Sequence, residues 1–193
     1  MMLIMHRVNT IEGLKNVSAE YGVEVDVRTD GNKLILNHEP MEGGDELEEY
    51  LKEYKHKFII FNIKEAGIED KVRALAEKYK VKDYFLLDVE FPYIYKAARS
   101  GVKNIAIRFS EDEPIEAALE YRGKVDWVWI DTNTKLPLDA DVVEKLKGFK
   151  TCLVCPSRWG RPEDIKEYKE KISELGIKLD AVMTEEKYVG DWK

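Results

Sequence analysis

Short apolar segments alternate with longer amphipathic ones from one end of this chain to the other. A short apolar segment is typical of a buried strand, and apolar residues three and four apart are typical of a helix. Strict alternation of the two predicts a parallel sheet in an α/β fold, and eight repeats are the number that closes a barrel. The expected strands are residues 3–6, 23–27, 58–64, 84–90, 104–110, 127–131, 151–155 and 181–184.

The expected helices lie between these strands. In residues 68–79, for example, Ile68, Val72 and Leu75 recur at helical spacing. Proline or aspartate marks several helix starts, and Asp45 is expected to begin the second helix. The full set of expected helices is 10–21, 45–54, 68–79, 92–99, 114–121, 140–146 and 162–175.

One additional strand interrupts the alternation. Residues 29–32, Thr-Asp-Gly-Asn, are a turn sequence, so residues 33–38 are expected to return antiparallel to the second strand. The chain of 193 residues is short for a barrel, which typically has about 250, and little follows residue 184. We therefore expect a small (β/α)8 TIM barrel with an extra hairpin strand after strand 2 and a reduced C-terminal end. An open doubly wound sheet is the alternative.

The length, charge and cysteine content of the chain limit the kinds of protein that it can be. A chain of 193 residues predicts one domain over residues 1–193, and the net charge of -7 argues against nucleic acid as a partner. The apolar start, residues 1–5, is too short for a signal peptide or a membrane span. Cys152 and Cys155 lie in an apolar segment, so we expect strand residues and not a redox motif. These features predict a cytoplasmic protein without membrane insertion, and they leave its oligomeric state open.

In a barrel of this kind the reactive residues stand at the carboxyl ends of the strands. We expect the two histidines, the two carboxylates and Lys64 at these positions to converge at one mouth of the barrel. The candidate site residues are His6, Arg7, Glu24, Asp26, His38, Lys64 and Arg108.

Glu24 and Asp26 are two residues apart on a strand, so their side chains share a face. Two carboxylates that point into a barrel repel each other unless a cation or protons lie between them. A hard divalent cation, Mg²⁺ or Ca²⁺, is one solution. The other is a buried ion pair of one carboxylate with Arg7, Arg28 or Lys64.

The chain has three histidines. His6 and His38 fall at strand ends, whereas His56 lies in a charged loop. Two histidines that flank a substrate can take a proton from a nucleophile and give one to a leaving group near neutral pH. Together with the carboxylates, this pair indicates a catalytic site.

Six features of residues 4–40 belong together: His6-Arg7, Asn9-Thr10, Glu24, Asp26, Asp30-Gly31 and His38. With these residues the segment resembles the glycerophosphodiester phosphodiesterases, which belong to the wider class of barrel phosphodiesterases that includes phosphatidylinositol-specific phospholipase C. Beyond residue 40 the resemblance is limited to the strand pattern and to residues 61–63, Phe-Asn-Ile.

The resemblance implies a role for five of these residues. His6 and His38 would be the general acid and base, and Arg7 would hold the phosphate. Glu24 and Asp26 would bind a divalent cation. Lys64 and Arg108 are further candidates to neutralise the phosphate charge.

Three positions depart from the family pattern. The family has glycine at the position of Val8 and aspartate at that of Glu39. More important, Lys64 stands where the family has a third metal-binding glutamate. We therefore expect that Lys64 either weakens the binding of the cation or takes the place of the cation.

The function predicted from these residues is hydrolysis of a small glycerophosphodiester-like molecule by two-histidine acid–base catalysis. One alternative is a non-catalytic or binding descendant of the barrel, in which Lys64 neutralises Glu24 or Asp26. Another takes Lys64 as a Schiff-base lysine, but this does not account for the two histidines beside two carboxylates.

Overall fold

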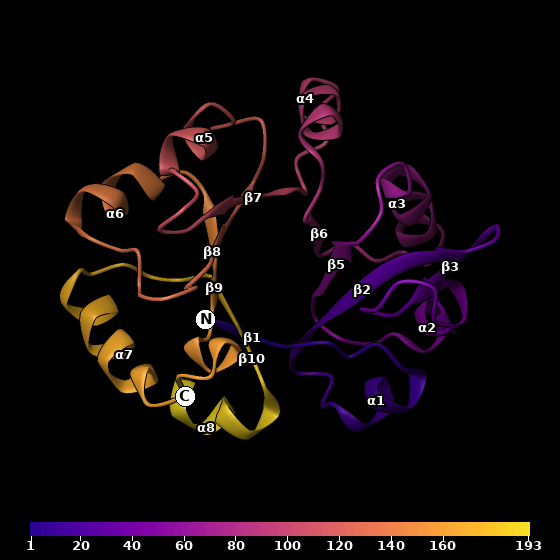
Figure 1. Cartoon of the computed structure of the whole chain (residues 1–193), viewed down its shortest axis with the longest axis horizontal. Helices are drawn as coiled ribbons and strands as arrows, with labels where there is room; N and C mark the ends of the chain where they lie inside the picture. Colours follow the sequence, from indigo (N-terminus) through magenta and orange to yellow (C-terminus); the bar gives the residue numbers. More distant parts are fainter. The chain divides into compact units, whose positions relative to one another are not determined.

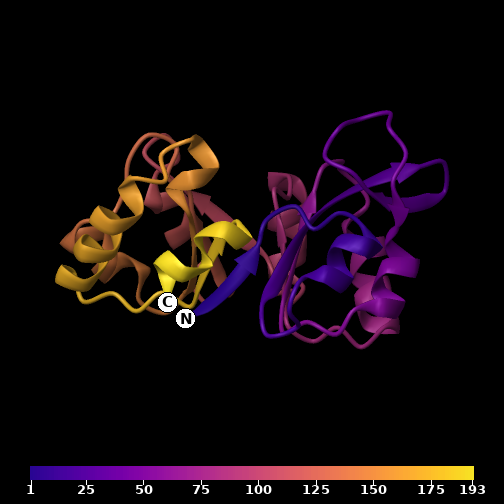
Figure 2. The ribbon, with the colours of Figure 1, turned by 90° about the horizontal axis from the view of Figure 1, so that it is seen from below.

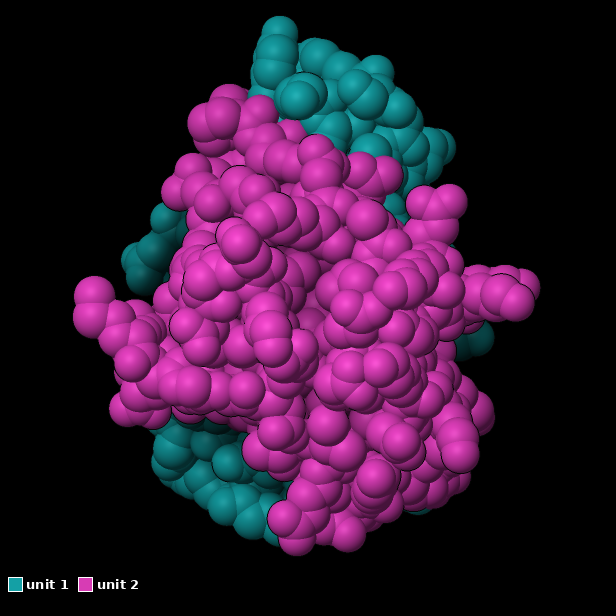
Figure 3. All heavy atoms as spheres, turned by 90° about the vertical axis from the view of Figure 1, so that its right-hand side faces the viewer, with its two compact units in different colours: residues 1–3, 95–193 teal, residues 4–94 magenta.

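The structure is a computed structural model that describes residues 1–193. It contains two compact units, residues 4–94 (unit 2) and residues 1–3 with 95–193 (unit 1), which Figure 3 distinguishes by colour. Strand β1 (Met2–Met5) and helix α4 (Phe91–Arg99) each contain a boundary between the units. The single domain expected from the sequence stays a prediction.

Unit 2 has four parallel strands that lie side by side in chain order (Figure 1). These are β1, β2 (Gly22–Asp30), β5 (Ile59–Ile63) and β6 (Tyr84–Leu87). In their register Asp26 of β2 pairs with Asn62 of β5, which pairs with Leu87 of β6. The intervening helices are α1 (Ile11–Asn16), α2 (Leu47–Glu53) and α3 (Glu69–Lys78).

The extra hairpin is present and confirms the prediction. Strand β3 (Lys33–Leu36) runs antiparallel to β2, and the turn contains Gly31 at a φ of 57°. A left-handed residue of this kind is what a tight hairpin turn requires. The two-residue strand β4 (Asp45–Glu46) then pairs with the end of β3. Because β3 stops at Leu36, His38 lies in the loop that follows.

Unit 1 holds the other four parallel strands, again in chain order. They are β7 (Ala106–Phe109), β8 (Trp127–Ile130), β9 (Lys150–Val154) and β10 (Ala181–Thr184). The longer helices are α5 (Ile115–Leu119), α6 (Ala140–Leu146) and α7 (Asp164–Glu174), and three short ones follow β9 or β10: η1 (Pro156–Trp159), η2 (Glu186–Tyr188) and α8 (Val189–Trp192). Both termini belong to this unit and lie close together (Figures 1 and 2).

The α/β class and the order of eight parallel strands are as predicted. A doubly wound sheet would need a reversal of strand order, and neither unit has one. The reduced C-terminal end is also present, because only the short η2 and α8 follow the last strand. Cys152 and Cys155 are buried and not bonded to each other. No helix combines the length and apolar character needed to cross a membrane.

Two expectations about helices are wrong. The first helix ends at Asn16 and not at residue 21, because the backbone of Val17 is already extended. Asp45 does not begin the second helix, which starts at Leu47. Its carboxylate accepts a hydrogen bond of 2.6 Å from the backbone N–H of Ile11, so Asp45 stabilises the start of α1 instead.

Candidate active site

His6 and Arg7 directly follow β1. The backbone of Arg7 is left-handed, with a φ of 54°, a conformation that costs on the order of 1–3 kcal/mol for a residue other than glycine. The N–H of Arg7 donates a hydrogen bond of 2.8 Å to Glu24 Oε2, and the N–H of Val8 donates one of 2.9 Å to the backbone oxygen of Glu24. This strained turn therefore joins the end of β1 to β2.

Glu24 and Asp26 share one face of β2, and each is only 1% exposed. Asn62 Nδ2 donates to Glu24 Oε1 at 3.0 Å, and Asn9 Nδ2 donates to Asp26 Oδ2 at 2.8 Å. Burial, followed by the charge of Asp26, raises the pKa of Glu24 to about 7, although the hydrogen bonds from Arg7 and Asn62 act in the opposite direction. Glu24 is therefore a carboxyl group that changes charge near neutral pH.

Lys64 directly follows β5, and its side chain is 16% exposed. Its ammonium nitrogen lies 3.3 Å from Asp26 Oδ1 and 3.5 Å from Asp88 Oδ2. On the other side of Asp26, Arg7 Nε lies 3.8 Å from Oδ2. The buried carboxylate of Asp26 is thus paired with two cationic side chains.

Glu24 and Asp26 alone give an incomplete set of ligands for a divalent cation. Both oxygens of Glu24, and Oδ2 of Asp26, already accept hydrogen bonds. Asp26 Oδ1 is buried and accepts none, but the ammonium of Lys64 lies beside it. Mg²⁺ and Ca²⁺ take six or more oxygen ligands, water included, and the chain has no cluster of three or more metal-ligating side chains. Lys64 and Arg7 both place positive charge beside Asp26.

His38 is held beside the same strand. The N–H of Asn37 donates a hydrogen bond of 3.1 Å to the backbone oxygen of Asp26. His38 Nδ1 lies 2.6 Å from Glu39 Oε1, and this contact lowers the pKa of Glu39. A carboxylate on Nδ1 orients the ring and leaves Nε2 as the nitrogen available to a substrate.

Six of the seven candidate residues belong to unit 2 and follow or lie on β1, β2, β3 and β5. The seventh, Arg108, belongs to unit 1. There its Nε donates to Glu113 at 2.8 Å and its Nη2 donates to Asp131 at 2.7 Å. Binding of substrate by Arg108 stays a prediction.

Asn9 and Asp88 also contribute to the site, although neither is among the seven candidate residues. Asp88 directly follows β6, and this strand-end position is the same signal that points to the other candidates. Its backbone is left-handed, with a φ of 55°. Asn9 lies in a loop and bonds both the carboxylate and the backbone N–H of Asp26. Its signal in the sequence is its place among the residues that carry the family resemblance.

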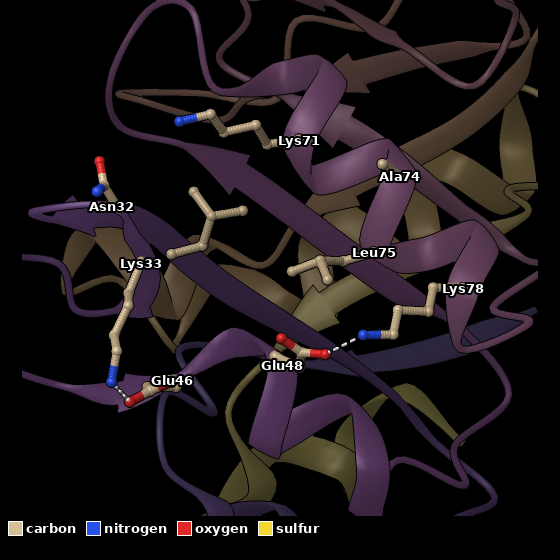
Figure 4. Close-up of a pocket in the computed structure, with 9 residues that line it drawn as sticks. Asn32, Lys33, Glu46, Glu48, Lys71, Ala74, Leu75 and Lys78 are labelled. Atoms are coloured by element: carbon tan, nitrogen blue, oxygen red, sulfur yellow. Dashed lines mark hydrogen bonds and ion pairs between the residues drawn. The ribbon is translucent and has the colours of Figure 1, made fainter.

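Unit 2 also has a hollow of about 360 Å³ between β3, the start of α2, and α3 (Figure 4). Ion pairs of Lys33 with Glu46 and of Lys78 with Glu48 lie at its rim, and Leu75 contributes apolar surface. None of the candidate site residues lines it. The hollow is therefore distinct from the candidate active site.

The sequence matches no protein-family model and has no significant similarity to a curated protein. Several solved structures share the fold. A protein of Agrobacterium tumefaciens, provisionally assigned as a glycerophosphoryl diester phosphodiesterase, matches with a TM-score of 0.68 and 14% identity over 97% of this chain and 94% of that one. A glycerophosphodiester phosphodiesterase of the same organism matches with a TM-score of 0.65 and 13% identity, over 95% and 96% of the two chains.

The third is a glycerophosphoryl diester phosphodiesterase of Parabacteroides distasonis, with a TM-score of 0.65 and 13% identity over 94% of this chain and 81% of that one. At such identities the likeness establishes the fold. The chain therefore has the barrel fold of the glycerophosphodiester phosphodiesterase structures.

Proposed function

We propose that this protein is a divergent glycerophosphodiester phosphodiesterase, which hydrolyses a small glycerophosphodiester-like molecule. The observation that carries the proposal is the fold match, over 95% of the chain, to a glycerophosphodiester phosphodiesterase structure. The histidines, carboxylates and cationic side chains at the strand ends of unit 2 support it. The proposed partner is thus a small-molecule phosphodiester. Because the two buried cysteines are free, we also propose a reducing compartment, the cytoplasm.

His6 and His38 are proposed to move the protons. One imidazole accepts a proton from the attacking water while the oxygen of that water forms a bond to phosphorus. The other, as imidazolium, donates a proton to the leaving alcohol oxygen while the old phosphorus–oxygen bond breaks. The contact of Glu39 with His38 Nδ1 supports this role, because it presents Nε2 in a fixed orientation.

Arg7 and Lys64 are proposed to stabilise the charge of the phosphate, with Arg108 as a further candidate. Positive groups fixed near a phosphoryl centre lower the energy of its transition state. We propose that Lys64 takes the place of the divalent cation expected from the sequence. The support is the ammonium 3.3 Å from Asp26 Oδ1, the one oxygen of the two buried carboxylates without a hydrogen bond.

The test is an assay of the purified protein with a panel of glycerol phosphodiesters, with phosphomonoester release followed by ³¹P NMR. Parallel reactions contain EDTA, Mg²⁺ or Ca²⁺. We expect hydrolysis that persists in EDTA and is lost in His6→Ala and His38→Ala. His56→Ala is the matched control, because the ring of His56 contacts the backbone of Val17 and no site residue. Absence of hydrolysis of every diester would contradict the proposed function, and a strict need for a cation would contradict the role of Lys64.

A further inference from the structure

Arg28 lies on the same face of β2 as Glu24 and Asp26. Alternation along a strand places residues 24, 26 and 28 on one face. The side chain of Arg28 is 15% exposed, compared with 1% for that of Asp26. Its guanidinium therefore lies partly buried, further toward the carboxyl end of the same strand.

The guanidinium binds the backbone of two candidate site residues. Nε and Nη2 donate hydrogen bonds of 3.1 and 2.9 Å to the backbone oxygen of His38. Nη1 donates one of 3.5 Å to the backbone oxygen of Lys64. One side chain thus connects the loop after β3 with the segment after β5.

Only an arginine can make these contacts together. His38 comes after the end of β3, at Leu36, and Lys64 comes after the end of β5, at Ile63. Their backbone carbonyls therefore do not take part in the hydrogen bonds between strands. Buried or partly buried carbonyls need a donor. The planar guanidinium offers five N–H groups in a fixed fork, whereas the ammonium of lysine offers three from a single point.

The guanidinium is itself held in place. Glu65 Oε1 lies 3.7 Å from Arg28 Nη1. The other oxygen of Glu65 accepts hydrogen bonds from the N–H and the hydroxyl of Thr29, at 3.2 and 2.5 Å. Thr29 is next to Arg28 on β2, so Glu65 contacts two successive residues of that strand. Together with the hydrogen bonds of Arg28, these contacts connect the end of β2 to the segments that carry His38 and Lys64.

We propose that Arg28 is a positioning residue for His38 and Lys64. It fixes the backbone from which each side chain reaches the site, and it takes no part in the reaction itself. This inference rests on the proposed function for its effect on catalysis. The contacts that carry it depend only on the structure of unit 2.

The first arm of the test measures backbone order and needs no activity. Hydrogen exchange is followed in the native protein, Arg28→Ala and Arg28→Lys. The matched control is Arg73→Ala, because Arg73 is a partly buried arginine of the same unit that contacts Asp70 and Tyr93. We expect faster exchange in residues 37–44 and 64–66 for both Arg28 variants and no change there for the control. Unchanged exchange in these segments would overturn the proposal.

The second arm measures catalysis. We expect kcat of Arg28→Ala to fall about 10–100-fold with KM little changed, since a misplacement of about 1 Å can cost a factor of about 10². Arg28→Lys should not restore the rate, because it keeps the charge and loses the fork. Millimolar guanidinium chloride should restore part of the rate in Arg28→Ala and should have no such effect on Arg28→Lys.

These results separate the two proposals. If the native protein hydrolyses no diester, the proposed function fails and the exchange data still decide whether Arg28 holds the two loops. If the native protein is active and Arg28→Ala matches it in kcat, the positioning role is wrong. Should Arg28→Ala not fold, Arg28→Lys supplies both measurements.

Discussion

Glu24→Gln removes a buried carboxyl group whose charge state is coupled to folding. The pKa of Glu24 is about 7 in the folded protein, against an ordinary value of 4.5 in an unfolded chain. Between these values the folded state binds more protons than the unfolded state. The contribution of Glu24 to the stability of the folded protein is therefore fully present below about pH 4.5, and it is lost as the pH rises to about 7. At about 1.4 kcal/mol per pH unit, the pKa difference corresponds to about 3 kcal/mol.

The substitution also has a cost that does not depend on pH. Both oxygens of Glu24 accept hydrogen bonds, and a glutamine can replace only one of them. An unmade buried hydrogen bond costs about 1–3 kcal/mol. Comparison of two pH values cancels this cost and leaves the contribution of the charge.

The assay is urea unfolding of the native protein and Glu24→Gln at about pH 4 and about pH 8, with a chelator present. We expect the native protein to lose about 3 kcal/mol more between the two pH values than the variant does. Glu48→Gln is the control, because the hydrogen bond from Lys78 lowers the pKa of the partly exposed Glu48, so that its contribution to stability changes with pH in the opposite direction. Equal losses in the native protein and in Glu24→Gln would refute the coupling of Glu24 to folding.

Three further predictions concern other parts of the molecule. Lys64→Glu adds a carboxylate and removes an ammonium beside the buried Glu24 and Asp26. Calorimetric titration with Mg²⁺, Ca²⁺ and Mn²⁺ should therefore show tighter binding of the cation than in the native protein. Equal binding would mean that Lys64 does not control the affinity for the cation. His6→Ala and His38→Ala should each lower the rate by about 10²–10⁴ with little change in thermal unfolding, and a rate that survives both would disprove the acid–base assignment. Asp139→Ala removes the side chain that accepts the N–H of Val142 at the start of α6, so urea unfolding should show a loss of about 1 kcal/mol, and no loss would mean that this cap is unimportant.

Much of the fold was predictable because each strand carries its own signal. Buried parallel strands are apolar throughout, and the Asp30-Gly31 turn marks the hairpin without reference to the rest of the chain. Lys64 was also predictable, because alternation along β5 puts it on the face of Asn62, which faces the buried carboxylates of β2.

The parts that escaped prediction depend on contacts between distant segments. The carboxylate of Asp45 caps α1, a helix more than thirty residues earlier in the chain, and no local pattern points to it. Asn9 reaches Asp26 from a loop, and Asp88 acquires its role only because Lys64 lies beside it. The pattern of strands and helices likewise gives no sign of a division into two compact units.

The left-handed turn at Arg7 means that one residue performs two tasks with different atoms. Its guanidinium faces Asp26, whereas its N–H supports Glu24. A change of side chain can abolish the first task and leave the second intact, because every residue except proline has an N–H. The hydrogen bond to Glu24 thus depends on the conformation of the backbone at residue 7 and not on the side chain there. A comparison of residue identities among related chains would not detect it.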